Sequence, residues 1–365
     1  MKIQFKNTPD QIELIKAMGS KDQTVSNEAV SIFAGFIGPV IQQVINSAGT
    51  ASRVYSDKPY NEDDSPSIPL DLYYDESVGT ISTWAQSQAG GLPTNQVEGV
   101  KEMKISTYRL DSAISFMKKY ARRSRLDVVA KATERMAQEI LIKQERNAWA
   151  VVLKALAEAS TQGLQHVYQS GTDDVFIVPD LSKLITKLRR INAAFNGGTA
   201  TGVDTEGLTD LFVSPEVKEQ IRNFAFNPMN TRQAGSGTTS IPLPDAIREN
   251  IFNSAGSSEI YGVSITDLLE LGAGKKYNVL FSEFAGSTNY DGATFSASND
   301  EILIGFDLSR EAFIRPIAQN ADSGSTFSVV PDDQWVSRSE KIGTYGALEE
   351  GRVCVDARGV CGLIV

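Results

Sequence analysis

The longest regular pattern of apolar residues lies in Ser124–Ser160, a stretch that neither Gly nor Pro interrupts. Ser124 followed by Asp127 resembles a capping box, and Gly163 lies just past the end. At about 1.5 Å per residue the pattern predicts a single helix about 55 Å long, which would act as a strut. Its apolar residues recur at helical spacing: Leu126, Val129, Met136, Ile140, Leu141, Trp149, Val152, Leu153 and Leu156.

Two shorter helical patterns, Thr8–Met18 and Ser26–Asn46, precede this segment and are separated by Gly19–Thr24. Both are too small to bury a core alone. We therefore predict that residues 1–55 form an arm, which lies on another part of the chain or on another chain.

The arm also holds the longest apolar run, Val30–Ile45, in which glycines, a proline and two glutamines occur. A membrane-spanning helix needs about 20 predominantly apolar residues. This run is shorter and interrupted, so it predicts a helix on a partner surface and no membrane anchor. Ile37 and Val40 are the residues of the run that we expect at a contact between subunits.

Residues 56–100 carry no helical pattern, and prolines make their first part an extended loop. Alternating residues predict two strands, Ile81–Ala85 and Val100–Tyr108, joined by the polar tip Gln86–Glu98. A two-stranded ribbon is marginal alone. We therefore expect the hairpin to rest on an adjacent subunit through Trp84, Leu92 and Pro93.

The second half of the chain predicts a compact α+β unit at about 175–325, followed by a strand-rich end. Its flexible polar loop is Arg232–Ser240, and Gly343–Gly351 is interpreted as a break between strands. The helices predicted are Pro179–Phe195 and one that begins at Ser214–Glu216. The strands predicted are Val175–Val178, Leu211–Val213, Tyr277–Phe281, Glu301–Phe306, Glu311–Ile317, Thr326–Val330, Gln334–Ser339, Arg352–Ala357 and Val360–Val365.

Charge narrows the possible partners. The 365 residues are 41% hydrophobic and 22% charged, with a net charge of -10. This balance argues against a dedicated DNA binder, although it permits weak contact with DNA. Where the segment Tyr108–Tyr120 leads into the long helix lies a basic cluster, formed by Lys118, Lys119, Arg122, Arg123 and Arg125. The cluster is either a solvated surface or pairs with acidic groups of a neighbour or with phosphate, and Arg122 and Arg123 are its candidate contact residues.

No constellation of catalytic residues stands out. The single histidine, His166, lies in a Gln-rich turn and is interpreted as a surface or capping residue. Cys354 and Cys361 have the spacing of neither a zinc motif nor a disulfide framework, so both are expected to be free thiols. Gly272–Lys276 lacks the full phosphate-loop pattern. We therefore predict no catalytic, cofactor or metal site.

This order of elements resembles the major capsid proteins of tailed bacteriophages, which have the Hong Kong 97-type capsid fold. Leu211–Glu216 stands where that family has its strand–helix segment, and Gly343–Val365 is similar to the family's closing strands. The resemblance implies an α+β fold made of an N-terminal arm, an extended loop, a peripheral domain with a spine helix, an axial domain and returning strands. The corresponding ranges are 1–55, 56–106, 107–174 with the spine at 124–160, 175–310 and 311–365.

The resemblance implies a protein that assembles with itself into hexamers and pentamers, which form the icosahedral head of a tailed phage around double-stranded DNA. Because the chain begins directly with the arm, it also implies a separate scaffolding protein or none, beside a portal and possible decoration proteins. The expected location is the virion capsid, assembled in the host cytoplasm. Two alternatives stay open, which are an encapsulin-type compartment shell and, in a different class, an unrecognised soluble enzyme.

Overall fold

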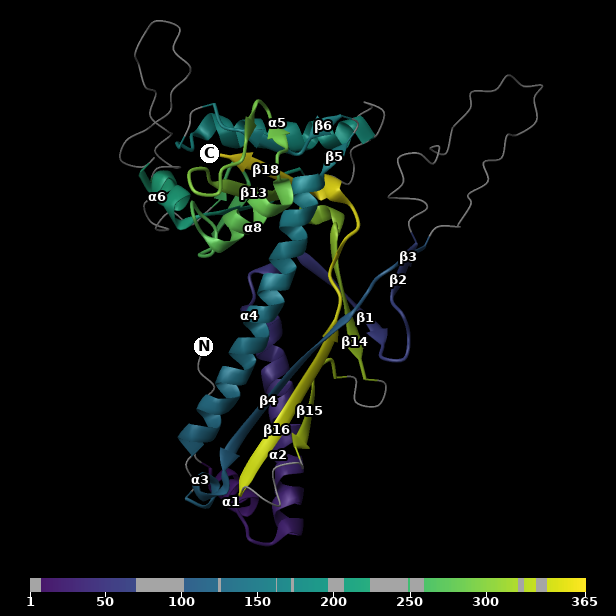
Figure 1. The fold of residues 1–365 in the computed structure, drawn as a ribbon, viewed down its shortest axis with the longest axis vertical. Coiled ribbons are helices and arrows are strands. Elements are labelled where there is room, and N and C mark those ends of the chain that lie inside the picture. The colour runs from purple at the N-terminus through teal and green to yellow at the C-terminus, as the bar shows by residue number, and fades with distance from the viewer. Residues whose placement is uncertain are drawn as a thin grey trace, which may run out of the picture. The chain divides into compact units, whose positions relative to one another are not determined.

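The computed structural model describes residues 8–69, 102–123, 126–161, 163–171, 174–195, 207–223, 249, 259–320, 325–332 and 340–365. The described chain forms two compact units (Figure 1). Unit 1 comprises the described residues of 1–70, 100–148 and 315–353, and unit 2 those of 71–99, 149–314 and 354–365. Each unit therefore combines segments that are far apart in the sequence.

The two units contain helices of very different length, of which α4 is the long helix predicted from the sequence. The helices are α1 (Pro9–Met18), α2 (Gln23–Ala48), α3 (Lys118–Arg122), α4 (Leu126–Glu158), α5 (Val178–Phe195), α6 (Pro215–Asn223) and α8 (Lys276–Ala285). The boundary between the units falls inside α4, at residues 148 and 149. Ser124, the predicted cap, lies outside the described residues.

The strands are mostly short, and the two longest lie next to each other in unit 1. They are β1 (Tyr55–Asn61), β2 (Ser67–Pro69), β3 (Glu102–Lys104), β4 (Tyr108–Met117), β5 (Ser160–Thr161), β6 (Leu164–Gln165), β7 (Val167–Gln169), β8 (Asp210–Val213), β9 (Glu259–Ile260), β10 (Val263–Asp267), β11 (Asn289–Tyr290), β12 (Ala293–Thr294), β13 (Ile302–Phe306), β14 (Phe313–Gln319), β15 (Ser328–Asp332), β16 (Lys341–Glu350), β17 (Val353–Cys354) and β18 (Val360–Ile364).

The core of unit 1 lies between a twisted antiparallel sheet and two helices. Strand β16 pairs along its whole length with β4, and its other edge pairs with β15 and, at one position, with β14. Alternate residues of β4 point to the core, where Leu110, Ile114 and Phe116 pack with apolar residues of α2 and α4. The opposite, odd-numbered face of β4 carries Arg109 and Asp111 and is exposed.

Helix α2 runs without interruption for 26 residues, so the glycines and the proline at position 39 do not break it. It begins at Asp22, whose side chain accepts a hydrogen bond from the backbone of Thr24. By length and mean hydropathy the segment Gln23–Ile41 could cross a membrane, yet 44% of it is buried within the protein. Val30, Phe33, Ile37 and Ile41 pack in the core of unit 1. The arm helix therefore lies on another part of its own chain, which is one of the two possibilities predicted.

Unit 2 is a sheet covered by helices on both faces. Its six strands follow the order β7-β18-β13-β8-β10-β9. On one face, Leu184 and Leu188 of α5 and Val217 of α6 pack against Leu211 and Leu303. On the other face lies the part of α4 that belongs to unit 2, which begins at Trp149. The Trp149 ring contacts Phe212 edge-on, with 5.0 Å between the ring centroids.

Several strand predictions for these units were wrong. Tyr277–Phe281 belongs to helix α8, because Tyr277, Phe281 and Ala285 recur every four residues and are all buried. Residues 175–177 are irregular, and Val178 already begins α5. Gly343–Gly351 is no break, since most of it lies inside the ten-residue strand β16.

Gly346 of β16 has a packing role. A Cβ at Gly346 would lie 2.6 Å from the ring of Phe327, which is buried in the same core. Gly346 therefore lets an aromatic ring approach the strand backbone closely. Two predicted segments, Ile81–Ala85 and Gln334–Ser339, lie outside the described residues, as does the hairpin tip Gln86–Glu98.

The part of the predicted extended loop that the structure describes contains strands that were not predicted. Tyr55–Asn61 forms β1 and pairs with β14. Ser67–Pro69 forms β2 and pairs with β3, which lies inside the predicted strand Val100–Tyr108. Tyr108–Met117, interpreted as a lead into the long helix, is the ten-residue strand β4.

Candidate functional site

A buried cluster of charges lies at the end of unit 1 where β16 finishes. Glu350 has no exposed surface. It accepts a 2.7 Å hydrogen bond from the Tyr108 hydroxyl and a 3.0 Å hydrogen bond from the Gln144 side-chain amide. The guanidinium of Arg352 lies 3.2 Å from Glu350, and that of Arg315 lies 3.9 Å away. Burial, and then the Glu350 carboxylate, raises the pKa of Tyr108 well above its ordinary value.

This cluster holds β1 against the rest of unit 1. Arg315 makes a two-pronged ion pair with Asp57 of β1, with its Nε 2.6 Å from Asp57 Oδ1. The guanidinium of Arg352 lies over the ring of Tyr55, 4.7 Å from its centroid, and the Tyr55 hydroxyl donates to the carbonyl of Ala148. Because a planar guanidinium suits both an ion pair and an aromatic ring, Arg315 and Arg352 hold β1 in place, while the Tyr55 hydroxyl links β1 to α4.

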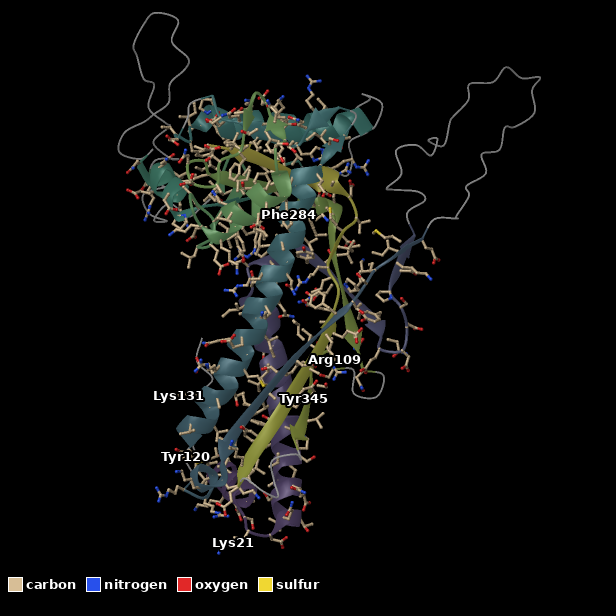
Figure 2. All side chains as sticks on the ribbon, in the orientation of Figure 1. Lys21, Arg109, Tyr120, Lys131, Phe284 and Tyr345 are labelled. Atoms are coloured by element: carbon tan, nitrogen blue, oxygen red, sulfur yellow. The ribbon has the colours of Figure 1, made fainter. Side chains whose placement is uncertain are left out.

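The exposed face of the same sheet carries a second polar group. Arg109 Nε donates to Asp111 at 2.8 Å, and Arg109 Nη2 lies 3.3 Å from the Tyr345 hydroxyl. Figure 2 shows Arg109 and Tyr345 on the neighbouring strands β4 and β16. The hydrogen bond from Tyr345, followed by Arg109, lowers the pKa of Asp111. The positive charge of Arg109 is therefore already directed toward Asp111.

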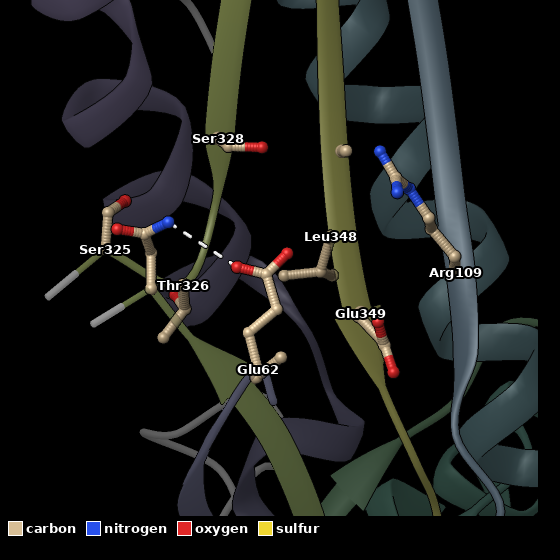
Figure 3. A pocket seen from close by; sticks show the side chains of 10 residues that line it. Glu62, Arg109, Ser325, Thr326, Ser328, Leu348 and Glu349 are labelled. Atoms are coloured by element: carbon tan, nitrogen blue, oxygen red, sulfur yellow. Dashed lines mark hydrogen bonds between the residues drawn. The ribbon is translucent and has the colours of Figure 1, made fainter. Parts of the chain in front are cut away.

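A cleft of about 80 Å³ opens beside this group (Figure 3). Its two carboxylates are Glu62 and Glu349, and Glu349 accepts hydrogen bonds from Tyr60 and Thr107. Thr326 Oγ1 is buried there and has no hydrogen-bond partner within the described part of the chain. The remaining lining is mostly of hydroxyl, amide and small side chains, from Ala318, Asn320, Ser325, Ser328, Ala347 and Leu348, together with Arg109. The cleft is thus rich in oxygen acceptors.

The predicted basic cluster lies at the other end of β4. Lys119, Arg122 and Arg123 are exposed on and just after α3. Arg122 Nε donates to the carbonyl of Gly19 at 2.7 Å, which fixes its stem against the turn between α1 and α2. No hydrogen bond or ion pair involves the side chain of Arg123 within the described residues. Arg123 therefore remains available to an external partner.

The predicted contact residues of the arm differ in exposure. Ile37 is only 4% exposed and packs in the core of unit 1, whereas Val40 is 36% exposed. Val40 continues an exposed apolar stripe along α2, formed with Val25, Ile32 and Phe36, which the apolar pattern of the sequence does not distinguish from the buried side. The sequence shows which residues of α2 are apolar, but only the position of the sheet decides which side of the helix is buried. Trp84, Leu92 and Pro93 lie outside the described residues.

In unit 2, His166 is fully buried, so its interpretation as a surface residue was wrong. Its Nδ1 lies 3.0 Å from the carbonyl of Val360, and its Nε2 lies 2.9 Å from Thr161 Oγ1. A neutral ring that donates from Nδ1 and accepts at Nε2 satisfies both contacts. Burial is the main cause that lowers the pKa of His166. Its two partners are a backbone carbonyl and a buried threonine hydroxyl, which hold the ring inside unit 2.

The two cysteines are both free, as predicted. Cys361 is buried in the sheet of unit 2, and Cys354 is partly buried. Burial raises the pKa of the Cys354 thiol to about 12. At neutral pH this thiol is therefore protonated and a poor nucleophile.

Comparison with known structures identifies the fold. The capsid of cyanophage P-SCSP1u is similar over 85% of this chain and 86% of its own, with 14% sequence identity and a TM-score of 0.51. The capsid of an empty GTA particle is similar over 87% of this chain and 90% of its own, with 12% identity and a TM-score of 0.52. The protein has the Hong Kong 97-type capsid fold. The resemblance inferred from element order is thus confirmed at the level of the fold.

Sequence comparison alone does not reveal this capsid fold, because no protein-family model and no curated protein sequence matches the chain. A third similar structure is the holo-SrpI encapsulin complex from Synechococcus elongatus PCC 7942, with 12% identity, a TM-score of 0.47 and coverage of 89% of this chain and 94% of that one. For a capsid fold, the informative surfaces are those that a second copy of the chain could cover. The cleft, the basic end of unit 1 and the exposed stripe of α2 are such surfaces.

Proposed function

We propose that this protein is the major capsid protein of a tailed phage, which assembles with itself into hexamers and pentamers of an icosahedral head around double-stranded DNA. The observation that carries the proposal is the capsid fold, shared over most of the chain with two capsid structures. A shell subunit needs surfaces for its neighbours, and unit 1 has exposed apolar and charged groups of that kind.

The same proposal extends to the partners. We expect a separate scaffolding protein and a portal in the assembling head, with decoration proteins as further possible partners, and assembly in the host cytoplasm. Contact with the packaged DNA is weak and non-specific, because each neutralised phosphate requires a Lys or Arg and the net charge is -10. Free subunits are therefore expected to shift duplex DNA at physiological salt only above micromolar concentration.

Electron microscopy of the purified protein tests the proposal directly. The expected result is closed shells, either spontaneously or when the scaffolding protein is co-expressed. Shells isolated from infected cells should contain double-stranded DNA. Particles that remain monomeric under all these conditions would contradict a shell function and would favour the unrecognised enzyme.

The contents of the shells separate the phage capsid from the encapsulin alternative, which has the same general kind of subunit. Nuclease-resistant DNA inside native shells supports the capsid proposal. A folded protein cargo in the absence of DNA would overturn it in favour of an encapsulin-type compartment. Mass spectrometry and nucleic-acid extraction from the same preparation give both answers.

A further inference from the structure

The cleft of unit 1 has the chemistry of a socket for a cationic group. Glu62 and Glu349 supply carboxylates, and hydroxyl and amide groups supply further acceptors. Arg109 also lines the cleft, but its hydrogen bonds go to Asp111 and Tyr345 rather than to these carboxylates. The volume of about 80 Å³ is several times the roughly 10–15 Å³ that one water needs, so the cleft admits a larger group than water. A guanidinium, with five donors and no acceptor, fits such an acceptor-rich hollow.

The chain carries an available guanidinium at the opposite end of the same strand. Arg109, at the cleft, is the second residue of β4, and Arg123 follows α3, which begins directly after β4 ends. A ten-residue strand spans about 30 Å, which is far beyond the reach of a side chain. In Figure 2, Tyr120 of α3 and Arg109 lie at opposite ends of this strand. Arg123 therefore cannot fill the cleft of its own unit 1.

We infer that Arg123 of one copy inserts into the cleft of the next copy, beside Glu62 and Glu349. The contact deepens the proposed shell function and rests on it. Arg123 and the cleft are different surfaces of the chain, so the contact is head-to-tail. Such contacts close into rings when the rotation between copies permits. The exposed turn next to the cleft, Asn61–Asp64, adds the carboxylates of Asp63 and Asp64. These charges steer the basic end of the approaching copy toward the cleft.

Reciprocal charge reversal tests this pairing. Arg123→Glu and Glu62→Lys are each expected to raise the subunit concentration needed for association about tenfold, because each places like charges opposite one another. The double variant restores a pair of opposite charges, so the subunit concentration that it needs for association should lie within about threefold of wild type. Two substitutions that act on unrelated surfaces would instead add their effects. Both positions are exposed, so the subunit fold is expected to survive. Circular dichroism and thermal melting of each variant check that point.

Matched controls change the same charges elsewhere on unit 1. Lys143→Glu and Glu139→Lys on α4 alter exposed residues that belong to neither surface and should leave association unchanged. The readout is sedimentation velocity between low and high salt, since a charge pair is screened as ionic strength rises. Sedimentation reports open oligomers as well as closed shells.

The outcomes separate this contact from the shell proposal. Wild-type shells with both single reversals harmless, or a double variant no better than the single ones, would overturn the contact and leave the shell function intact. Salt-sensitive open oligomers rescued by the double variant would support the contact and count against a closed shell. A wild type that never associates would overturn both.

Discussion

At the scale of single residues, Glu350 is the side chain on which the buried charges of unit 1 converge. It has no exposed surface and lies against two arginines, a tyrosine and a glutamine. Removal of one partner from a buried ion pair leaves the others uncompensated. We predict that Glu350→Ala lowers the free energy of unfolding by about 3–5 kcal/mol. Urea unfolding of the free subunit, followed by circular dichroism, measures it.

The matched control is Glu158→Ala, which breaks the exposed pair between Lys154 and Glu158 on α4. Its effect on the free energy of unfolding should lie within about 0.5 kcal/mol, because exposed pairs contribute little. Equal effects of the two substitutions would mean that Glu350 does not hold the cluster together.

His166 makes stability depend on pH. Its folded pKa is lowered, so between the folded value and the unfolded value of about 6.5 the unfolded chain binds more protons than the folded one. Stability is therefore complete above about pH 6.5 and is lost as the pH falls toward the folded pKa. The nearby charges, Asp356 and Arg358, act in opposite directions and are smaller causes than burial.

The prediction is that melting temperature falls between pH 7.5 and pH 5.5 and that His166→Gln flattens this dependence. The comparison is clean because the chain has one histidine. Burial raises the pKa values of Glu301 and Asp307, so these groups favour the folded state as the pH falls through the acidic range, opposite to His166. This contribution is the same in wild type and in His166→Gln. An unchanged pH profile in His166→Gln would show that another group titrates.

At the scale of elements, we predict that a Gly→Ala substitution has opposite effects on stability at Gly346 and Gly35. Gly346→Ala in β16 should destabilise unit 1 by about 1–3 kcal/mol, because its Cβ would meet the buried ring of Phe327. Gly35→Ala on the exposed side of α2 meets nothing within 4 Å and should stabilise the helix by about 0.5–1 kcal/mol. Differential scanning calorimetry of both variants tests the pair, and a shift of the same sign in both would contradict it.

Elements with a long and strongly periodic pattern could be predicted from the sequence. α4 has the predicted extent to within two residues at each end, and α5 and β18 also lie where their patterns placed them. Each of these elements buries a face that its own residues define. For such elements, the spacing of apolar residues along the chain is enough to predict the helix or strand.

The elements that were missed depend on distant partners. β16 looked like a break because glycine is rare in strands, but Gly346 admits Phe327, which directly precedes β15 in the chain. Glu350 was not singled out, since Arg315, Tyr108 and Gln144, three of its partners, lie on other elements. The cleft likewise combines residues of β4, β14, β15 and β16 with Glu62, so no local spacing could indicate it.

At the scale of the whole molecule, substitution of two tryptophans can separate a contact between subunits from a contact within the core of one subunit. Trp84 belongs to the predicted hairpin and is proposed to pack on a neighbouring copy, where tryptophan is favoured. We predict that Trp84→Ala leaves subunit melting unchanged but lowers the yield or melting temperature of shells, because the loss repeats in every subunit. Calorimetry of free subunits and of shells measures the two quantities separately.

Trp149 provides the contrast. It is fully buried in unit 2, in contact with the rings of Phe212 and Phe306. Trp149→Ala should therefore destabilise the free subunit itself, by about 3–5 kcal/mol. Unfolding of the subunit by Trp84→Ala, or unchanged shells, would exclude the hairpin as a clamp between subunits.

The interleaving of the two units has a consequence for the order of events during synthesis. β16, the strand that pairs with β4, β15 and β14, is separated from β4 by more than two hundred residues, which include most of unit 2. Unit 2 in turn needs β18, which lies between β7 and β13. Neither sheet can be completed on the ribosome until these late strands have emerged, and closing such distant pairs is slow. In the proposed shell, nascent chains would therefore lack both finished sheets, and only completed subunits could join a growing lattice.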